Sequence, residues 1–176
     1  QLSLDEISNR LKGFLSQKPE ALLEKIKISG IRGRGGAGFP MAIKLEGCAK
    51  APGTQKFIVC NADEGDPGSY SDRYLLEHQP YLVLIGLWIS AYITGANKAV
   101  VYIRAEYPES VKIMDQAVQD FINHGLVGNS ILGSSFDLDF KIIKAQGAYI
   151  CGEETALLSS IEGQRPEVTV RPPFPV

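Results

Sequence analysis

Residues 98–104 of the chain read Lys98-Ala99-Val100-Val101-Tyr102-Ile103-Arg104, five apolar residues between two charged ends. β-branched and aromatic residues prevail in this run, and a short apolar run of this kind predicts a buried strand. The stretches Lys56–Cys60 (KFIVC) and Phe136–Lys144 predict two further strands. Because helical patterns separate the three strands, the sequence predicts an α/β layer fold with a mostly parallel sheet.

The stretch before residues 98–104, Gln79–Asn97, holds 19 residues without a charge. That length raises a membrane-spanning helix as an alternative. Gly86, the polar residues within the stretch and the strand that follows it favour a buried core helix instead. Pro80 is suited to the start of such a helix and Gly95 to its end.

Three more segments near the predicted strands have helical patterns. Apolar residues recur at helical spacing in Pro108–Asn123, which predicts an amphipathic helix. Another helix is predicted over Glu153–Ile161. Pro40 is suited to the first turn of a short helix that runs to about Cys48. These helices precede or alternate with the strands, as a layered α/β fold requires.

The first 29 residues are also predicted to be helical. Ser3 is suited to cap a first helix, Pro19 to open a second one, and Gly30 to end it. We therefore expect an N-terminal helical segment, residues 1–29, followed by an α/β domain, residues 30–176.

Composition and charge exclude several classes of protein. Lys and Arg number 18 against 20 Asp and Glu, so the net charge is −2 and the pI is near 5.7, which argues against a nucleic-acid-binding module. The cysteines Cys48, Cys60 and Cys151 are isolated, so neither a disulfide framework nor a metal or iron–sulfur site is predicted within these residues. The chain begins at Gln1 without a signal-peptide pattern and ends in a proline-rich stretch, which predicts a fragment of a longer protein.

The glycine loop, Gly30–Pro40 (GIRGRGGAGFP), has five glycines among eleven residues. It contains a G-x-G-x-x-G pattern but follows a predicted helix rather than a strand, so it is not the usual dinucleotide fingerprint. The charged residues from Gly30 to Lys44 are all positive: Arg32, Arg34 and Lys44. Exposed backbone N–H groups flanked by cations suit a phosphate. The alternative is a tight structural turn with solvent-facing arginines.

Two acidic motifs are further candidates for binding. Asn61–Gly65 (NADEG) follows a predicted strand and offers donors and acceptors for hydroxyl and ring N–H groups, although the same residue types also form solvated turns. In Tyr149–Thr155 (YICGEET), two carboxylates lie in the first turn of a helix, where the helix dipole alone would favour them. Gly152 there also suits the floor of a pocket for a flat ring. Cys151 is predicted to be a small buried residue rather than a nucleophile.

Taken together, the motifs closely resemble one family. It is the NADH-binding flavoprotein (51 kDa-type) subunit of respiratory complex I, which is related to the diaphorase subunit of NAD-reducing hydrogenases and the beta subunit of NAD-dependent formate dehydrogenases. The resemblance extends from about Gly30 to Pro175 with the motifs in the same order. The strings that carry it are GIRGRGGAGFP (30–40), CNADEGDPG (60–68), DR (72–73), GAYICGEETAL (147–157), SIEG (160–163) and RPPFP (171–175).

The resemblance implies a Rossmann-like domain that binds FMN and accepts a hydride from NADH. Electrons would leave singly to a 4Fe–4S cluster in a later part of the parent protein, so the isolated chain is expected to be inactive. The implied partners are other subunits of a multi-subunit redox complex, including a 2Fe–2S thioredoxin-like subunit, and not nucleic acid. The implied location is the cytoplasm, including the cytoplasmic face of the membrane where a larger complex holds the protein there. No membrane-spanning segment of its own is implied.

The resemblance also assigns roles to individual residues. FMN and the nucleotide would contact the glycine loop at Gly33, Arg34, Gly35, Gly36 and Gly38, with Lys44 near the FMN. The residues that would bind the flavin or line the FMN and nicotinamide pocket are Asn61, Asp63, Glu64, Gly65, Tyr149, Gly152, Glu153 and Glu154. Among them, Glu64 and Glu154 would serve catalysis by tuning the flavin and nucleotide release. The nucleotide side would include Phe39 and Phe174, which would stack on NADH, and Arg171.

Three positions depart from the complex I pattern, in which an aromatic residue follows the lysine, a phenylalanine stacks on the nucleotide and a lysine precedes PPFP. This chain has Leu45, Gly47 and Arg171 at those positions. The departures favour a hydrogenase or formate dehydrogenase partner over complex I. A different class of function, a non-catalytic nucleotide-binding or assembly module, is disfavoured because the glycines and the NADEG string are retained.

Overall fold

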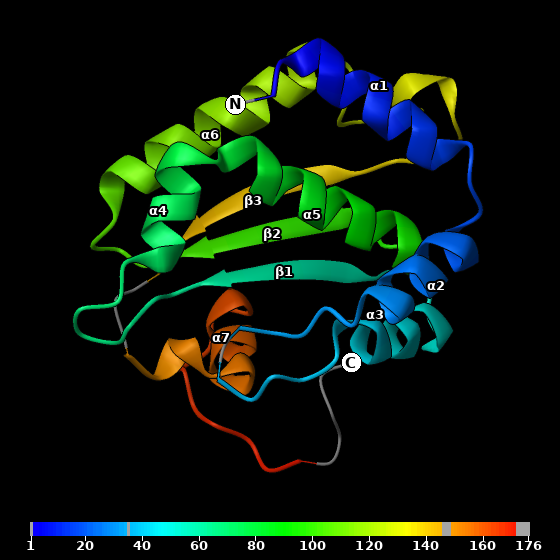
Figure 1. The fold of residues 1–176 in the computed structure, drawn as a ribbon. Coiled ribbons are helices and arrows are strands. Elements are labelled where there is room, and N and C mark those ends of the chain that lie inside the picture. The colour runs from blue at the N-terminus through cyan, green and yellow to red at the C-terminus, as the bar shows by residue number, and fades with distance from the viewer. Residues whose placement is uncertain (1, 35, 146–148, 172–176) are drawn as a thin grey trace.

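The fold is built on one parallel sheet, seen in a computed structural model that describes residues 2–34, 36–145 and 149–171. Strands β1 (Phe57–Ala62), β2 (Lys98–Ile103) and β3 (Asp139–Lys144) lie in the order β1-β2-β3, and both pairs are parallel. Helices cover both faces of the sheet (Figure 1). The predicted α/β layer fold with a parallel sheet is confirmed.

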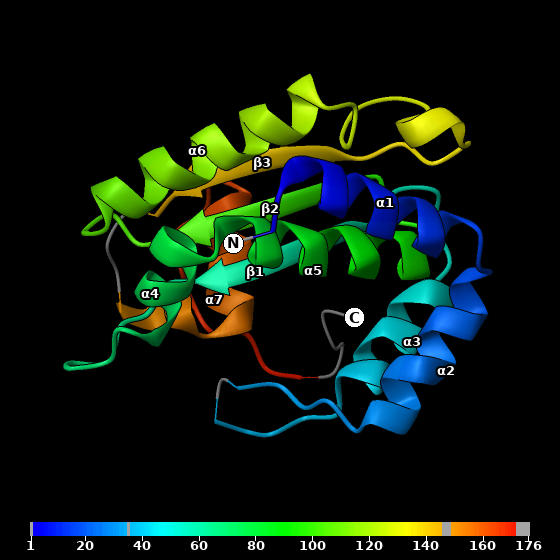
Figure 2. The ribbon, with the colours of Figure 1, turned by 45° about the horizontal axis from the view of Figure 1, so that its top comes forward.

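The two faces of the sheet are covered unequally. Helices α1 (Leu4–Leu15), α4 (Ser71–His78), α5 (Pro80–Thr94) and α6 (Pro108–Asn123) contribute to the main core on one face. On the other face, α7 (Glu154–Ile161) packs over a smaller cluster that includes Tyr102, Cys151 and Leu157. Figure 2 shows α7 on the side of the sheet away from α1 and α6.

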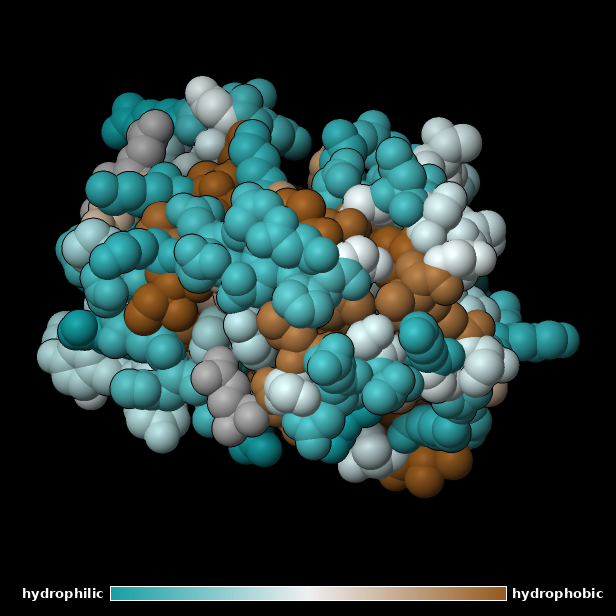
Figure 3. All heavy atoms as spheres, turned by 90° about the horizontal axis from the view of Figure 1, so that it is seen from above, coloured by the Kyte–Doolittle hydropathy of each residue, from teal (hydrophilic) through white to brown (hydrophobic). Residues whose placement is uncertain are grey.

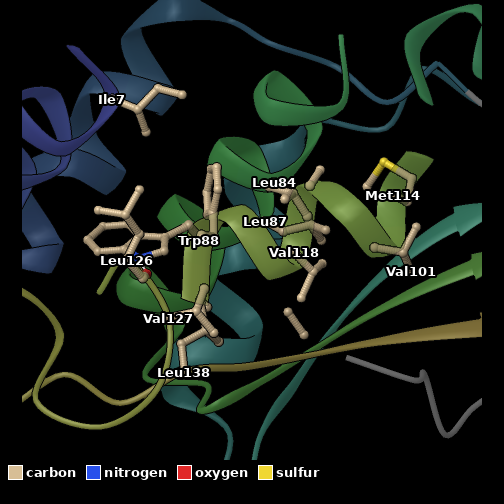
Figure 4. Packing of buried hydrophobic residues seen from close by; sticks show 14 of the residues in the cluster. Ile7, Leu84, Leu87, Trp88, Val101, Met114, Val118, Leu126, Val127 and Leu138 are labelled. Atoms are coloured by element: carbon tan, nitrogen blue, oxygen red, sulfur yellow. Dashed lines mark hydrogen bonds between the residues drawn. The ribbon is translucent and has the colours of Figure 1, made fainter. Parts of the chain in front are cut away.

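Helix α5 forms the centre of the main core. Leu84 and Trp88 are fully buried, and the Trp88 indole N–H donates to the Leu126 carbonyl at 3.0 Å. Figure 4 shows Trp88 beside Leu126. The helix begins at Pro80 and ends before Gly95, whose φ of 74° is left-handed, so the predicted core helix is confirmed. Among the described residues, no helix is long and apolar enough to span a membrane.

The N-terminal helices are part of the same packing. Ser3 caps α1 with a full capping box, and Ile7 and Leu11 of this helix are fully buried in the main core. Helix α2 (Pro19–Ser29) buries Leu22 against α3 (Met41–Lys50) and α5. Figure 3 shows the molecule from above the view of Figure 1, and on this face hydrophilic side chains surround small groups of apolar ones.

Several boundaries of helices and strands differ from those predicted from the sequence. Strand β1 extends to Ala62, so Asn61 is a strand residue and not part of a turn. Strand β3 begins at Asp139 and not at Phe136, because Leu138 instead pairs antiparallel with Gly128. Pro40 is the N-cap of α3 rather than a residue of its first turn.

Three short helices were not predicted: α4, and the 3₁₀ helices η1 (Ile131–Gly133) and η2 (Tyr149–Gly152). Gly152 lies at the end of η2, which directly precedes α7. Helix α4 has no side-chain cap from the residue next to its first turn, and the Glu64 carboxylate accepts from its first N–H groups instead.

Candidate functional site

The candidate site lies at the edge of the sheet where β1 ends. In parallel sheets, ligands bind beyond the carboxyl ends of the strands. Asn61, near the end of β1, donates from Nδ2 to the Gly152 carbonyl of η2 at 2.9 Å, and its Oδ1 accepts from the Asp63 N–H at 3.1 Å. The NADEG and YICGEET motifs, about ninety residues apart in sequence, therefore meet at this edge.

Asp63 carries the feature that most clearly points to a ligand. The residue is 8 % exposed, and its Oδ2 has no hydrogen-bond partner among the described residues. Burial raises the pKa of this carboxyl, while the charge of Arg104 lowers it and that of Glu106 raises it. A Cβ placed on Gly152 would lie 3.4 Å from the Asp63 carbonyl, so η2 packs closely against Asp63. A buried polar atom without a partner is costly, and a ligand N–H or O–H would satisfy it.

Glu64 has the opposite environment, although it is adjacent and equally buried, with 7 % exposure. The acidic turn, Asp63–Gly68, brings its carboxylate to the first turn of α4. Burial raises the pKa of Glu64, but hydrogen bonds outweigh this effect and hold the pKa at about 2. Its donors are the Asp72 and Arg73 N–H groups and the hydroxyls of Ser69, Ser71 and Tyr107. Glu64 thus caps α4 from outside the helix, which explains why the sequence did not reveal this helix.

Tyr149 lies over the acidic turn. Its ring packs on Gly65, where an added Cβ would come within 2.8 Å of the ring carbon Cδ2. Its hydroxyl donates to Asp66 Oδ1 at 3.0 Å, and this bond raises the pKa of the phenol. The side chain is 71 % exposed. Gly65 therefore leaves room for Tyr149, and Tyr149 presents an open aromatic surface beside the site.

Four predicted site residues form one ion-pair cluster. Lys44 Nζ of α3 lies 3.0 Å from Glu154 Oε2, and Arg171 Nη1 lies 2.7 Å from Glu154 Oε1. Arg171 also pairs with Glu153, which caps α7 by accepting from the Thr155 N–H at 2.8 Å. The cluster joins α3, α7 and the C-terminal stretch, so the predicted cations and acids do lie together.

The glycine loop is an exposed hairpin. Arg32 and Pro40 pair antiparallel, and the Gly33 N–H donates to the Phe39 carbonyl at 2.8 Å. Gly36 has a φ of 101°, and an added Cβ would meet nothing within 4 Å.

The remaining residues predicted to contact FMN or the nucleotide differ in their exposure. Arg34 and Gly36 are exposed, and Gly38 is half-buried. The Phe39 ring, also exposed, lies 5.7 Å from Lys44 Nζ. Gly35 and Phe174 are outside the described residues.

The structure explains one of the three departures from the complex I pattern, the one at Leu45. Leu45 is buried with Leu22 and Ile93. It is therefore a packing residue between α2, α3 and α5, and not a surface available to a nucleotide. Lys44, the preceding residue on α3, points its ammonium group toward Glu154 instead.

Arg104 also lies at the candidate site, although it was not predicted from the sequence. It directly follows β2, and its guanidinium Nη1 donates to the Glu64 carbonyl. Together with Asp66, Ser69, Glu106 and Tyr107, it lines a surface pocket of about 280 Å³. The signal was available, since a residue just past the carboxyl end of a parallel strand belongs to the same sheet edge as the NADEG motif.

The cysteines take no part in a metal site in the described portion of the chain, which contains no group of three or more His, Cys, Asp or Glu residues able to hold a metal. Cys151 is fully buried, as predicted. Burial raises the pKa of the Cys60 thiol to about 11, so this thiol stays protonated at neutral pH.

The chain matches a known protein family over most of its length. The family described as the Nuo51 FMN-binding domain matches residues 26–176. The chain belongs to this family. It is 45 % identical over 166 residues to an NADH-quinone oxidoreductase subunit of Aquifex aeolicus, covering 94 % of this chain and 39 % of that protein.

Hydrogenase subunits are equally similar. The chain is 44 % identical over 172 residues to the NAD-reducing hydrogenase HoxS subunit alpha of Cupriavidus necator, covering 97 % of this chain and 29 % of that protein. Among solved structures, an NAD⁺-reducing [NiFe]-hydrogenase in the H₂-reduced state matches with a TM-score of 0.83 and 37 % identity, over 92 % of this chain and 27 % of that chain. The chain thus spans less than two fifths of these relatives, and identity does not separate the two kinds.

Proposed function

We propose that this chain is the flavin-binding part of an NADH dehydrogenase, in which hydride passes between NAD(H) and FMN. The observation that carries the proposal is Asp63, a buried carboxylate with a free oxygen at the edge of the sheet where the family motifs meet. Asn61 and Gly152 lie beside it. An acceptor in this setting fits a flavin, which offers ring N–H and ribityl hydroxyl groups.

The residues present fit both ends of FMN, the flavin ring and the phosphate. Asp63 and Asn61 would bind the flavin's polar edge, and Gly152 would let the ring approach the backbone. The N–H groups and positive residues of the glycine loop, with Lys44, would bind the phosphate. When bound, FMN supplies the redox chemistry, taking up a hydride and releasing electrons one at a time.

The protein's own task is to bind, orient and exclude water. Tyr149 and Phe39 offer exposed rings on which the flat groups of NADH would stack. Glu154, which Lys44 and Arg171 hold from two sides, would contact the nucleotide and influence its release. Glu64 would act on the flavin by fixing the acidic turn. No general base is needed, because hydride transfer between two bound rings moves no proton to the protein.

We further propose that the chain works within a multi-subunit complex in the cytoplasm. Its relatives are named as subunits of NADH-quinone oxidoreductases and of NAD-reducing hydrogenases. A 2Fe–2S thioredoxin-like subunit as neighbour, and a 4Fe–4S cluster elsewhere in the same polypeptide, would carry the electrons onward. Co-purification of the tagged full-length gene product, with iron analysis of the complex, tests this assembly.

The central test is an FMN titration of the full-length gene product followed by addition of NADH. Stoichiometric FMN binding and bleaching of the flavin absorbance by NADH are the expected results. Flavin that binds but is not bleached would favour the alternative of a non-catalytic nucleotide-binding or assembly module. Failure to bind FMN would contradict the proposal.

A further inference from the structure

The free oxygen of Asp63 can accept a hydrogen bond from a ligand in a fixed position only if the acidic turn holds this side chain in place. One residue contacts the backbone on both sides of Asp63. The Arg104 N–H donates to the Ala62 carbonyl at 3.4 Å, which extends the pairing of β1 and β2 by one residue. The Arg104 guanidinium donates to the Glu64 carbonyl. Arg104 therefore binds the carbonyl groups of the residues immediately before and after Asp63.

The Arg104 side chain is itself held firmly. Its Nε lies 3.1 Å from Glu106 Oε2, and its guanidinium carbon lies 5.1 Å from the centre of the Tyr107 ring. Tyr107 in turn donates its hydroxyl to Glu64 Oε2 at 3.2 Å. A guanidinium is planar and remains charged at any relevant pH, so it can make a stacked contact and directed hydrogen bonds at once.

Arg104 also contributes to the electrostatic balance at Asp63. Burial raises the pKa of Asp63, Arg104 opposes this effect, and Glu106 adds to it. Burial also raises the pKa of Tyr102, which interacts with Asp63, to about 12, so this phenol is neutral at neutral pH. Arg104 is therefore the cation that favours the ionised form of Asp63 among the groups acting on it.

We propose that Arg104 is a positioning residue for the flavin site, which clamps the backbone on both sides of Asp63 and so holds its carboxylate in place for the ligand. This inference rests on the proposed function, in which Asp63 binds FMN. Arg104 need not contact FMN itself, since its hydrogen bonds reach Ala62, Glu64 and Glu106.

The molecule offers a matched control in Arg73. The Arg73 guanidinium carbon lies 5.5 Å from the centre of the same Tyr107 ring, and its Nε pairs with Glu77 at 3.0 Å. It thus shares the stacked contact and an acidic partner with Arg104. Its side chain makes no hydrogen bond to the acidic turn that the structure records.

The experiment compares FMN dissociation constants of the wild type, R104Q, R104K and R73Q in the full-length gene product, from pH 5 to 8. We expect R104Q to bind FMN at least about tenfold more weakly at pH 7, with the acid-side loss of affinity moved to higher pH. R104K keeps the charge, so it should restore the wild-type pH profile but only part of the affinity. R73Q should bind within about twofold of the wild type.

A second measurement does not depend on FMN. Titration of the Asp63 carboxyl by carbon NMR should give a higher pKa in R104Q than in the wild type, and no change in R73Q. Equal FMN binding by R104Q and wild type, an unchanged Asp63 titration in R104Q, or equal losses in R104Q and R73Q would overturn the clamp. A wild type that fails to bind FMN would instead reject the proposed function, and the Asp63 titration would still decide on the clamp.

Discussion

The acidic turn and the glycine loop are both predicted to bind FMN, yet the protein builds them in different ways. The acidic turn is held by contacts from α4, from η2 and from Arg104 and Tyr107, which lie between β2 and α6, and two of its three carboxylates, those of Asp63 and Glu64, are buried. The glycine loop is an exposed hairpin closed mainly by its own backbone. The comparison indicates that the side of the site where we propose the flavin ring to bind is organised in advance, whereas the side that we propose for the phosphate depends on local backbone conformation.

The largest effect is expected where the acidic turn is anchored. E64Q removes the charge that accepts five hydrogen bonds at the start of α4. We expect it to lower the free energy of unfolding by about 2–4 kcal/mol, as measured by urea denaturation. R34Q in the glycine loop, with an exposed side chain, should change it by less than about 0.5 kcal/mol. Equal effects of the two variants would remove the contrast between the regions.

The same anchor predicts a pH dependence of stability. The pKa of Glu64 falls from an ordinary 4.5 to about 2 in the folded protein. Its contribution is therefore present above pH 4.5 and is lost as the pH falls from there toward 2. The loss amounts to about 3 kcal/mol. Urea denaturation at several pH values should show this decline in the wild type and a flatter one in E64Q; parallel curves would contradict the assignment.

A change in the glycine loop should separate folding from binding. Gly36 has a left-handed φ of 101° and open space around it, so G36V adds backbone strain of about 1–2 kcal/mol without a clash. We expect the protein to fold and FMN binding to be lost. FMN fluorescence quenching measures the affinity, and G13A, in α1 with ordinary φ and no near neighbours, is the control. Flavin retained by G36V at wild-type occupancy would contradict a role for the loop.

The smallest effect on stability is expected at the ion pair of Lys44 and Glu154. Both side chains are partly exposed, so K44Q should change the free energy of unfolding by less than about 1 kcal/mol. FMN affinity should nonetheless fall and lose part of its salt dependence, because Lys44 is predicted to lie near the phosphate. Titrations at low and high salt measure this; a K44Q affinity as salt-dependent as that of the wild type would place the phosphate elsewhere.

The sequence predicted what depends on local patterns. Strand β2, the core helix α5 and the capped helix α1 follow from apolar periodicity, Pro and Gly signals and the N-cap residue Ser3. The family motifs also identified the two acidic stretches that meet at Gly152. Each of these features is encoded within a short stretch of chain.

The sequence could not predict what depends on distant partners. Helix α4 is capped by Glu64, seven residues before Ser71, and not by a neighbouring side chain. Neither the engaged state of Glu64 nor the free oxygen of Asp63 is visible in the string NADEG, because both depend on α4, Tyr107 and Arg104. The sequence alone therefore cannot show which of two adjacent acidic residues is hydrogen-bonded within the protein and which has a free oxygen.

The central claim, that FMN binds at the free oxygen of Asp63, is tested most directly by D63N. The variant removes a buried charge but not a hydrogen bond of the Asp63 side chain within the protein, since Oδ2 has no partner in the described structure. We predict unchanged or higher stability together with at least about tenfold weaker FMN binding at pH 7. Wild-type FMN affinity in D63N, or a loss of stability as large as that of E64Q, would contradict the account.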